Sequence, residues 1–291
     1  MSKLKAKAPE LTKPGHIKGL LFGASGAGKT WFSLTFPNPY YIDTEGGADL
    51  RHYQQRLKDA KGAYMGQEDG SLLFSEVLDQ VKALATEKHS YRTLVIDSIT
   101  KLYQVCIADE ADKLGEKDAF GASKKPAIAN MRRLVAWIQK LDMNVWFVAH
   151  EMTEWGNDSK GNRTEIGKIA DVWDKLIYEL DLTIRVIKQG PDRIGLVTKS
   201  RLEGFPDASR FTLSYPEFAD HYGKDAIESP VVPVQLALPE QVAEIKRLIE
   251  TVRVDPEQIE KWNSKANAES FEDYSSDHAE KVITFLKSKI K

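Results

Sequence analysis

The first half of the chain alternates between short apolar runs and segments in which apolar residues recur every three or four positions. The runs have the length of buried strands, and they are Ile17–Phe22, Tyr40–Asp43, Thr93–Ile96 and Asn144–Ala149. The recurring pattern predicts helices over Ser71–Lys88 and Ala127–Leu141, and a shorter one over residues 31–36 that Pro37 ends. Strands and helices that alternate in this way predict a parallel sheet with right-handed crossovers.

The pattern changes in the second half of the chain. Leu182–Ile187 and Ile194–Thr198 flank a Gly-Pro turn, which predicts an antiparallel hairpin that extends the sheet. After a stretch with little periodicity, the spacing of apolar residues predicts three short helices in a small bundle. The expected fold class is therefore α/β, with a mostly parallel sheet, an antiparallel extension and a C-terminal helical bundle. The predicted divisions are a flexible basic arm (1–15), a core (16–222), a linker (223–238) and a small helical domain (239–291).

Composition narrows the function classes. The 291 residues carry a net charge of −2, which excludes a globally basic nucleic-acid coat and leaves only a local patch for such contacts. Cys106 is the single cysteine, so it forms no internal disulfide; its apolar helical surroundings predict a small core residue. No apolar run approaches the ~18 residues of a membrane span, and no secretory signal is recognisable. We expect a cytoplasmic protein, in the host cytoplasm if it is viral.

A phosphate-binding loop follows the first predicted strand and precedes the first predicted helix. It fits the pattern G-x-x-x-x-G-K-[ST] and consists of Gly23, Ala24, Ser25, Gly26, Ala27, Gly28, Lys29 and Thr30. Glycines let backbone N–H groups turn inward onto phosphates, and the helix N-terminus favours negative charge. We expect Lys29 to reach the β- and γ-phosphates and the Thr30 hydroxyl to bind Mg²⁺.

Two carboxylates come at or just beyond strand ends. Asp97 ends the third predicted strand, where a carboxylate holds Mg²⁺ through water in P-loop enzymes; the alternative is a helix N-cap. Glu45 lies just past the second, where a carboxylate orients and deprotonates the attacking water; the alternative is a solvated turn residue. A P-loop kinase needs no glutamate here, because its acceptor hydroxyl replaces water.

At this point a family resemblance becomes specific. The run Ile42-Asp43-Thr44-Glu45 resembles the segment that carries the catalytic glutamate in RecA-like recombinases. Residues from roughly 15 to 215 are similar to the phage-type RecA-like ATPase family, which includes truncated RecA-like single-strand annealing proteins. The resemblance implies a RecA-like P-loop core, ATP as the nucleotide and an action on single-stranded DNA in viral recombination or replication.

The resemblance also implies roles for three further residues. His150, after the fourth strand, occupies the place of a γ-phosphate sensor that is often Gln in the family; a capped structural histidine is the alternative. Lys199 and Arg201 occupy the place of a basic pair that reaches a neighbouring subunit's γ-phosphate; a solvated strand end is the alternative. Strand alternation puts both on one face.

Nucleic-acid contacts are predicted from two polar segments. RecA-like recombinases carry a mobile DNA-binding loop after the fourth strand, and here that segment is polar and Gly-containing. A second candidate is Gly115–Arg133, although its Arg132 and Arg133 also suit the solvated face of a helix. The candidate contacts are Lys124, Lys125, Trp155, Lys160, Arg163 and Lys168, with Trp155 stacking on a base and the cations on phosphates. For the nucleotide's own base, the candidates are Trp31, His52 and Tyr53.

The predicted function is an ATP-binding and hydrolysing protein of phage-type recombination or replication. It uses Mg²⁺, binds single-stranded DNA and promotes annealing or recombination as a homo-oligomer, in a filament or a ring. A single-strand-binding protein is a candidate partner. The alternatives are a ring-type helicase-like motor and a nucleotide-gated DNA-binding adaptor with little hydrolysis; a small-molecule kinase is less favoured, because no arginine-rich lid is recognisable.

Overall fold

A large, mostly parallel sheet forms the centre of the molecule. The computed structural model describes residues 6, 8, 15–119 and 121–290, so most of the predicted basic arm lies outside the described residues. In spatial order the sheet contains β10 (Arg210–Thr212), β9 (Asp192–Ser200), β8 (Leu182–Gln189), β1 (Lys18–Phe22), β5 (Asn144–Ala149), β4 (Thr93–Asp97), β2 (Pro39–Asp43) and β3 (Ala63–Met65). From β8 to β3 in this order, the strands are parallel to one another. β9 pairs antiparallel with both of its neighbours, β8 and β10. The predicted α/β class and antiparallel extension are confirmed.

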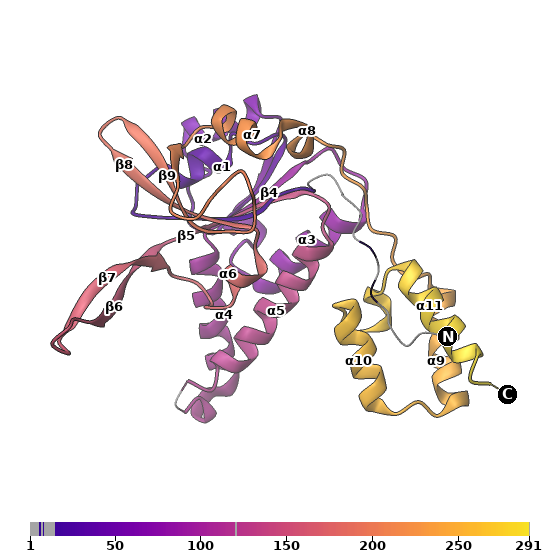
Figure 1. The fold of residues 1–291 in the computed structure, drawn as a ribbon. Helices are drawn as coiled ribbons and strands as arrows, with labels where there is room; N and C mark the ends of the chain where they lie inside the picture. Colours follow the sequence, from indigo (N-terminus) through magenta and orange to yellow (C-terminus); the bar gives the residue numbers. More distant parts are fainter. Residues whose placement is uncertain (1–5, 7, 9–14, 120, 291) are drawn as a thin grey trace.

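Helices cover both faces of this sheet (Figure 1). One face packs against α3 (Phe74–Thr86), α4 (Ile99–Leu114), α5 (Lys124–Lys140) and α6 (Leu176–Glu179). The other packs against α1 (Lys29–Ser33), α2 (Arg51–Asp59) and α7 (Tyr215–Tyr222). Strand side chains alternate between two apolar clusters, which is why the central strands are apolar at nearly every position. Cys106 lies buried in the first cluster, as predicted.

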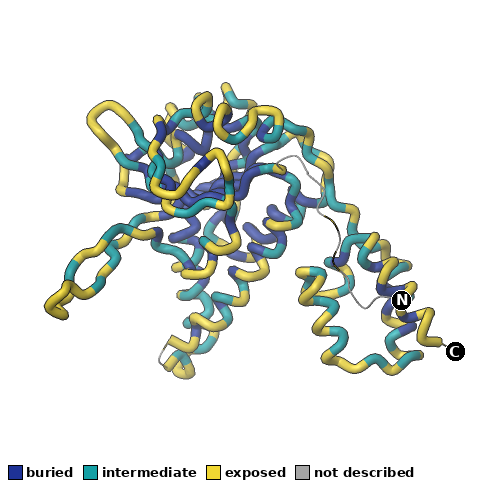
Figure 2. Tube along the Cα trace, in the orientation of Figure 1, coloured by how far each residue is buried: buried dark blue, intermediate teal, exposed yellow. Residues whose placement is uncertain are grey.

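The polar segment after His150 differs from its prediction. It is an antiparallel hairpin of β6 (Glu151–Asn157) and β7 (Arg163–Ala170) that projects from the core, and its residues are mostly exposed (Figures 1 and 2). The carboxylate of Asp158 accepts hydrogen bonds from the backbone N–H groups of Lys160 and Asn162, which closes the turn. Because neither face covers a core, the strands carry no apolar alternation, and the hydropathy pattern alone indicated a loop.

The C-terminal helices form a bundle with its own apolar cluster. They are α9 (Pro239–Val252), α10 (Pro256–Ala266) and α11 (Ser276–Lys287). The segment predicted as a linker is more ordered than expected, because it begins with α8 (Lys224–Ile227) and then follows the core. The backbone N–H of Val234 donates to the carbonyl of Ala85 at 2.7 Å. Short 3₁₀ turns, η1 (Gln67–Asp69), η2 (Gly115–Lys117) and η3 (Phe271–Asp273), complete the elements.

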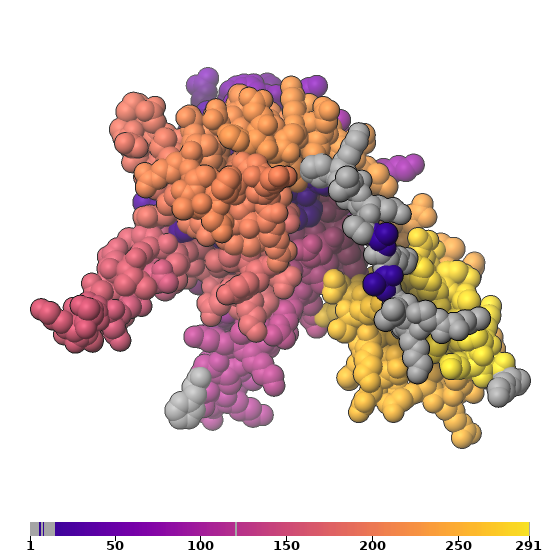
Figure 3. All heavy atoms as spheres, in the orientation of Figure 1, coloured from indigo at the N-terminus to yellow at the C-terminus, as the bar shows by residue number. Residues whose placement is uncertain are grey.

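The bundle is a distinct lobe beside the core in the space-filling view (Figure 3). Two side chains of α5 reach it: Arg133 forms an ion pair with Glu269, and Lys140 Nζ donates to the carbonyl of Asp273 at 2.9 Å. Within the described part of the chain, no helix has the length and apolar character needed to cross a membrane.

Gly19 in β1 tests how tightly the central strand is packed. A Cβ at this position would lie 2.3 Å from the Trp146 ring, in the buried centre of the sheet. We therefore expect Gly19→Ala to lower the free energy of unfolding by about 1–3 kcal/mol, the usual effect of overpacking. Urea denaturation measures this loss. Gly15→Ala is the control, because nothing lies within 4 Å of its added Cβ; equal stability of both variants would contradict the packing described.

Candidate nucleotide-binding site

The carboxyl ends of the parallel strands bring the predicted site residues to one edge of the sheet. β1 leads into the phosphate loop, β2 into Glu45, β4 ends at Asp97, and β5 is followed by His150. Together they border a cleft of about 680 Å³, lined by Gly23, Ala24, Ser25, Gly26, Lys29, Thr30, Tyr41, Glu45, Gly46, Gly47, Leu50, Tyr53, Asp97, His150 and Glu151. Ligands bind open parallel sheets at this kind of edge.

The phosphate loop has the backbone conformation that its glycines allow. Gly23 and Gly28 have φ angles of 152° and 100°. A Cβ on Gly23 would lie 2.4 Å from the carbonyl oxygen of Val186, so a side chain would disrupt the start of the loop. The Lys29 Nζ donates to the carbonyls of Gly23 and Ala24 at 2.8 and 3.0 Å. Burial lowers the pKa of Lys29, although the carboxylates of Asp97, Glu45 and Glu151 act in the opposite direction.

Thr30 and Asp97 lie together beneath the loop. The Thr30 hydroxyl donates to Asp97 Oδ2 at 2.5 Å. Burial, together with the nearby carboxylates of Glu45 and Asp43, raises the pKa of Asp97 to about 6, although the hydrogen bond from Thr30 acts in the opposite direction. A hydroxyl and a buried carboxylate are ligands that Mg²⁺ prefers, and a divalent cation would relieve this crowding of negative charge. The donor set therefore fits Mg²⁺ that shares its remaining ligands with water and phosphates.

The N-cap alternative for Asp97 does not hold. Ser98 is the N-cap of α4, and its side chain accepts from the backbone N–H of Lys101 at 3.1 Å. Asp97 is the last residue of β4, and it lines the cleft. The peptide bond between the two residues is cis.

Glu45 is held by hydrogen bonds from two neighbouring strand ends. Ser98 Oγ donates to Glu45 Oε1 at 2.5 Å, and His150 Nε2 lies 2.5 Å from the same oxygen. A carboxylate only accepts, so His150 Nε2 is the donor. Burial alone would raise the pKa of Glu45, but the hydrogen bonds from Ser98 and His150 bring it below its usual range. Glu45 is therefore ionised at neutral pH and fixed in direction.

Asp43 is a site residue that the sequence analysis missed. Its buried carboxylate accepts from the backbone N–H groups of Glu45 and Gly46 at 3.0 Å each and of Ala48 at 2.6 Å. These bonds fix the turn that carries Glu45 into the cleft. The sequence analysis also missed Ser98. Both residues act through a turn that forms only when β2 and β4 pair, so no local pattern indicates their roles.

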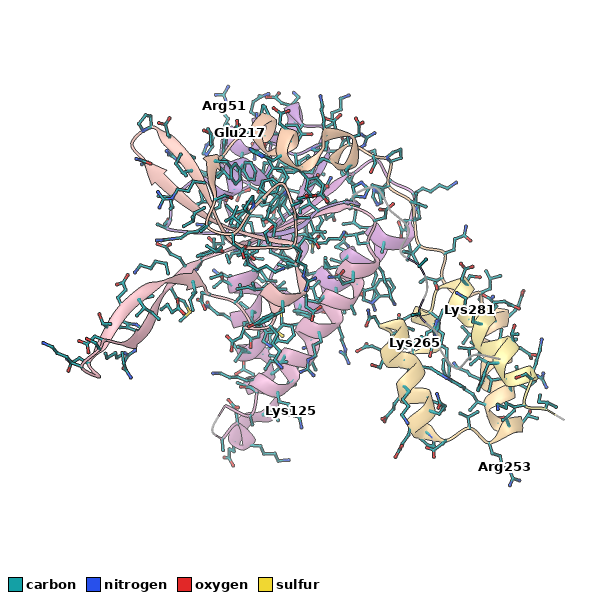
Figure 4. The ribbon with its side chains drawn as sticks, in the orientation of Figure 1. Arg51, Lys125, Glu217, Arg253, Lys265 and Lys281 are labelled. Carbon is teal, nitrogen blue, oxygen red and sulfur yellow. The ribbon has the colours of Figure 1, made fainter. Side chains whose placement is uncertain are left out.

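Other predicted residues lie elsewhere. Lys199 lies near the end of β9 and Arg201 directly follows the strand, at the far edge of the sheet, because β9 runs antiparallel to β8. Their side chains donate to the carbonyls of Leu180 and Tyr178. They are not part of their own chain's cleft. Lys124 and Lys125 begin α5 at the tip of the α4–α5 pair, where Figure 4 labels Lys125.

The remaining nucleic-acid candidates share the β6–β7 hairpin. Trp155 is 53% exposed, and the Arg163 guanidinium lies 4.7 Å from the centre of its ring. Lys168 Nζ bonds Thr153 Oγ1 and Glu165 Oε1, both at 2.8 Å, and Lys160 is exposed in the turn. The hairpin begins directly after His150.

Aromatic side chains cluster beside the cleft mouth. Tyr53 lines the cleft, with its ring centroid 4.2 Å from that of His52 and 6.4 Å from that of Trp31. The three candidates for the nucleotide's base therefore lie together. Arg193, which the sequence analysis did not consider, packs its side chain near Gly28 from the β8–β9 hairpin.

A comparison with known protein families agrees with a nucleotide-binding site at this position. A family model described as an AAA domain matches residues 16–210, which is more than half of the chain. No curated protein matches the sequence. Among solved structures, the chain is similar to a prototypical ATPase from the type III secretion system of pathogenic bacteria, at 15% identity and a TM-score of 0.43, over 94% of this chain and 80% of that one. That likeness carries no argument about function.

Asp43→Ala tests whether this carboxylate holds the Glu45 turn. The variant leaves three backbone N–H groups without their acceptor, so we expect the free energy of unfolding to fall by about 1–3 kcal/mol. Urea denaturation measures the change. The control is Asp49→Ala, an exposed aspartate of the same turn region; a loss of the same size in both variants would show that the Asp43 bonds are not decisive.

Proposed function

Because the chain belongs to the AAA domain family, we propose that it is a magnesium-dependent ATPase that binds single-stranded DNA. Within that family we assign it to the phage-type RecA-like ATPases, as an oligomeric recombination or replication protein that promotes annealing. One observation carries the proposal: Glu45, at the phosphate edge, is hydrogen-bonded to His150, directly before the exposed hairpin that carries Trp155.

In the proposed reaction, the backbone N–H groups of the phosphate loop and Lys29 hold the triphosphate. Thr30 and Asp97 would hold Mg²⁺, which neutralises phosphate charge when it is bound. Ser98 and His150 both bond Oε1 of Glu45, so Oε2 is the oxygen left to accept a proton from the attacking water. Water then attacks the γ-phosphorus, the bond to the β-phosphate oxygen breaks, and ADP and phosphate form.

His150 would connect the two ligands. Its side chain bonds Glu45, and its backbone N–H donates to Thr100 Oγ1 at 2.9 Å, which fixes the backbone at this position. Thr100 Oγ1 in turn donates to the carbonyl of Asp171, at the other end of the hairpin, at 2.7 Å. Both roots of the β6–β7 hairpin are thus bonded to Thr100 of α4, so a change at Glu45 has a short path to the proposed DNA-binding surface.

The position of Lys199 and Arg201 supports the proposal of an oligomer. They lie at the sheet edge opposite their own cleft, so they contribute to hydrolysis only if they reach the nucleotide of a neighbouring copy. A basic residue supplied in this way contributes on the order of 10³–10⁵ in rate in other nucleotide hydrolases.

Hydrolysis is tested with two variants of the cleft. Glu45→Gln keeps the phosphate contacts but loses the proton acceptor, so we expect kcat to fall by about 10²–10⁴-fold while ATP still binds. Lys29→Ala should lose ATP binding itself. Steady-state phosphate release and calorimetric titration with ATP separate the two effects. Glu116→Gln, an exposed glutamate of η2, is the control; an unchanged kcat in Glu45→Gln would remove this residue from the mechanism.

DNA binding is tested at the hairpin. Trp155→Ala removes an exposed stacking surface, and we expect the affinity for single-stranded DNA to fall about tenfold. Fluorescence anisotropy with labelled oligo(dT) measures it. Trp155→Phe, which keeps an aromatic ring, should bind nearly as the parent does. If Trp155→Ala binds with unchanged affinity, the hairpin is not the DNA contact.

A further inference from the structure

The C-terminal bundle has one face whose cations lack carboxylate partners. Several other basic side chains of the bundle are neutralised: Lys246 pairs with Glu272, and both Arg247 and Lys287 pair with Glu244. No salt bridge within the described part of the chain involves Lys265, Lys281 or Lys289. The bundle therefore contains both carboxylate-paired cations and these three unpaired lysines, which distinguish the surface that carries them.

These unpaired cations surround two aromatic rings. Lys281 and Phe285 are four residues apart on one side of α11, and Lys289 lies in the turn that follows the helix. Phe285 is 47% exposed, and Lys289 Nζ lies 5.3 Å from its ring centre. Trp262 of α10 meets Phe285 edge to face, with ring centroids 5.9 Å apart.

Lys265 continues this surface one helical turn beyond Trp262 on α10. Figure 4 shows Lys265 and Lys281 at the same end of the bundle. Burial and the positive charges of Lys265, Lys281 and Lys140 lower the pKa of His278. The carboxylate of Glu280, the neighbour of Lys281, bonds Gln241 of α9.

We propose that this face, formed by Trp262, Lys265, Lys281, Phe285 and Lys289, is a second binding surface for single-stranded DNA. The inference rests on the proposed function, which makes single-stranded DNA a ligand of this chain. Unpaired lysines suit a phosphate backbone. The exposed Phe285 ring, with the partly buried Trp262 beside it, suits unpaired bases, which stack on aromatic side chains in single-strand-binding proteins. Duplex DNA shields its bases and would use only the lysines. The surface lies on a lobe separate from the β6–β7 hairpin, so the two contacts would act on one strand or on two strands to be annealed.

The test uses the full-length chain and compares two triple variants that each remove three positive charges. One is Lys265→Ala with Lys281→Ala and Lys289→Ala; the other is Lys246→Ala with Arg247→Ala and Lys287→Ala, whose cations are carboxylate-paired. Anisotropy with labelled oligo(dT) over a range of salt gives the slope of log K against log salt. We expect the first variant to reduce this slope by about 2, since each single-strand phosphate contact contributes about 0.7, and the second to leave it nearly unchanged.

Three further measurements complete the test. Phe285→Ala should weaken oligo(dT) binding about tenfold, as loss of a stacking contact does, and the triple Lys→Arg variant should keep the parent slope. Hydrolysis of ATP without DNA should be unchanged in every bundle variant. Equal slopes in the two triple variants would overturn the proposal, as would loss of affinity for an oligo-aspartate peptide with oligo(dT) binding intact, because the occupant would then be an acidic protein segment.

The same data separate this inference from the proposed function. If the parent protein binds no oligo(dT), the proposed function fails and this surface fails with it. If Trp155→Ala weakens binding while the Lys265, Lys281 and Lys289 variant binds as the parent does, only the second surface is wrong.

Discussion

The parallel pairing of β1, β5, β4 and β2 is the constraint on which the site depends. Parallel strands end at one edge, so residues from four distant segments meet there without any loop having to reach far. The register pairs Asp43 directly with Asp97, which sets the Glu45 turn against Ser98. Apolar clusters on both faces fix this register, because a slip by one residue would exchange the side chains between the two faces.

This arrangement brings several carboxylates close together. Glu45 and Asp97 line the cleft and the buried Asp43 lies beside them, where its carboxylate accepts from three backbone N–H groups. Burial and the neighbouring carboxylates raise the pKa of Asp97, and a bound cation would favour its ionised form. Lys29 alone, folded back onto the loop carbonyls, supplies one positive charge against three carboxylates. A site of this composition is suited to bind a magnesium–polyphosphate complex rather than a free anion.

Sequence patterns predicted those parts of the fold and the site that depend on residues close together in the chain. The buried strands, the phosphate loop and the strand-end carboxylates follow from short-range periodicity, and the bundle follows from amphipathic helices. The roles of Asp43 and Ser98 were out of reach, because they exist only after β2 and β4 pair. The β6–β7 hairpin was missed because its strands project into solvent and satisfy each other's backbone without an apolar face. The positions of Lys199 and Arg201 follow from the antiparallel direction of β9, which the predicted hairpin already implied.

The central claim is that this cleft binds a magnesium–nucleoside triphosphate complex. Calorimetric titration of ATP into the purified chain, with Mg²⁺ and then with a chelator in its place, tests it most directly. The account predicts saturable binding at one site per chain that weakens strongly when Mg²⁺ is removed. Absence of binding, or an affinity that does not depend on Mg²⁺, would contradict it.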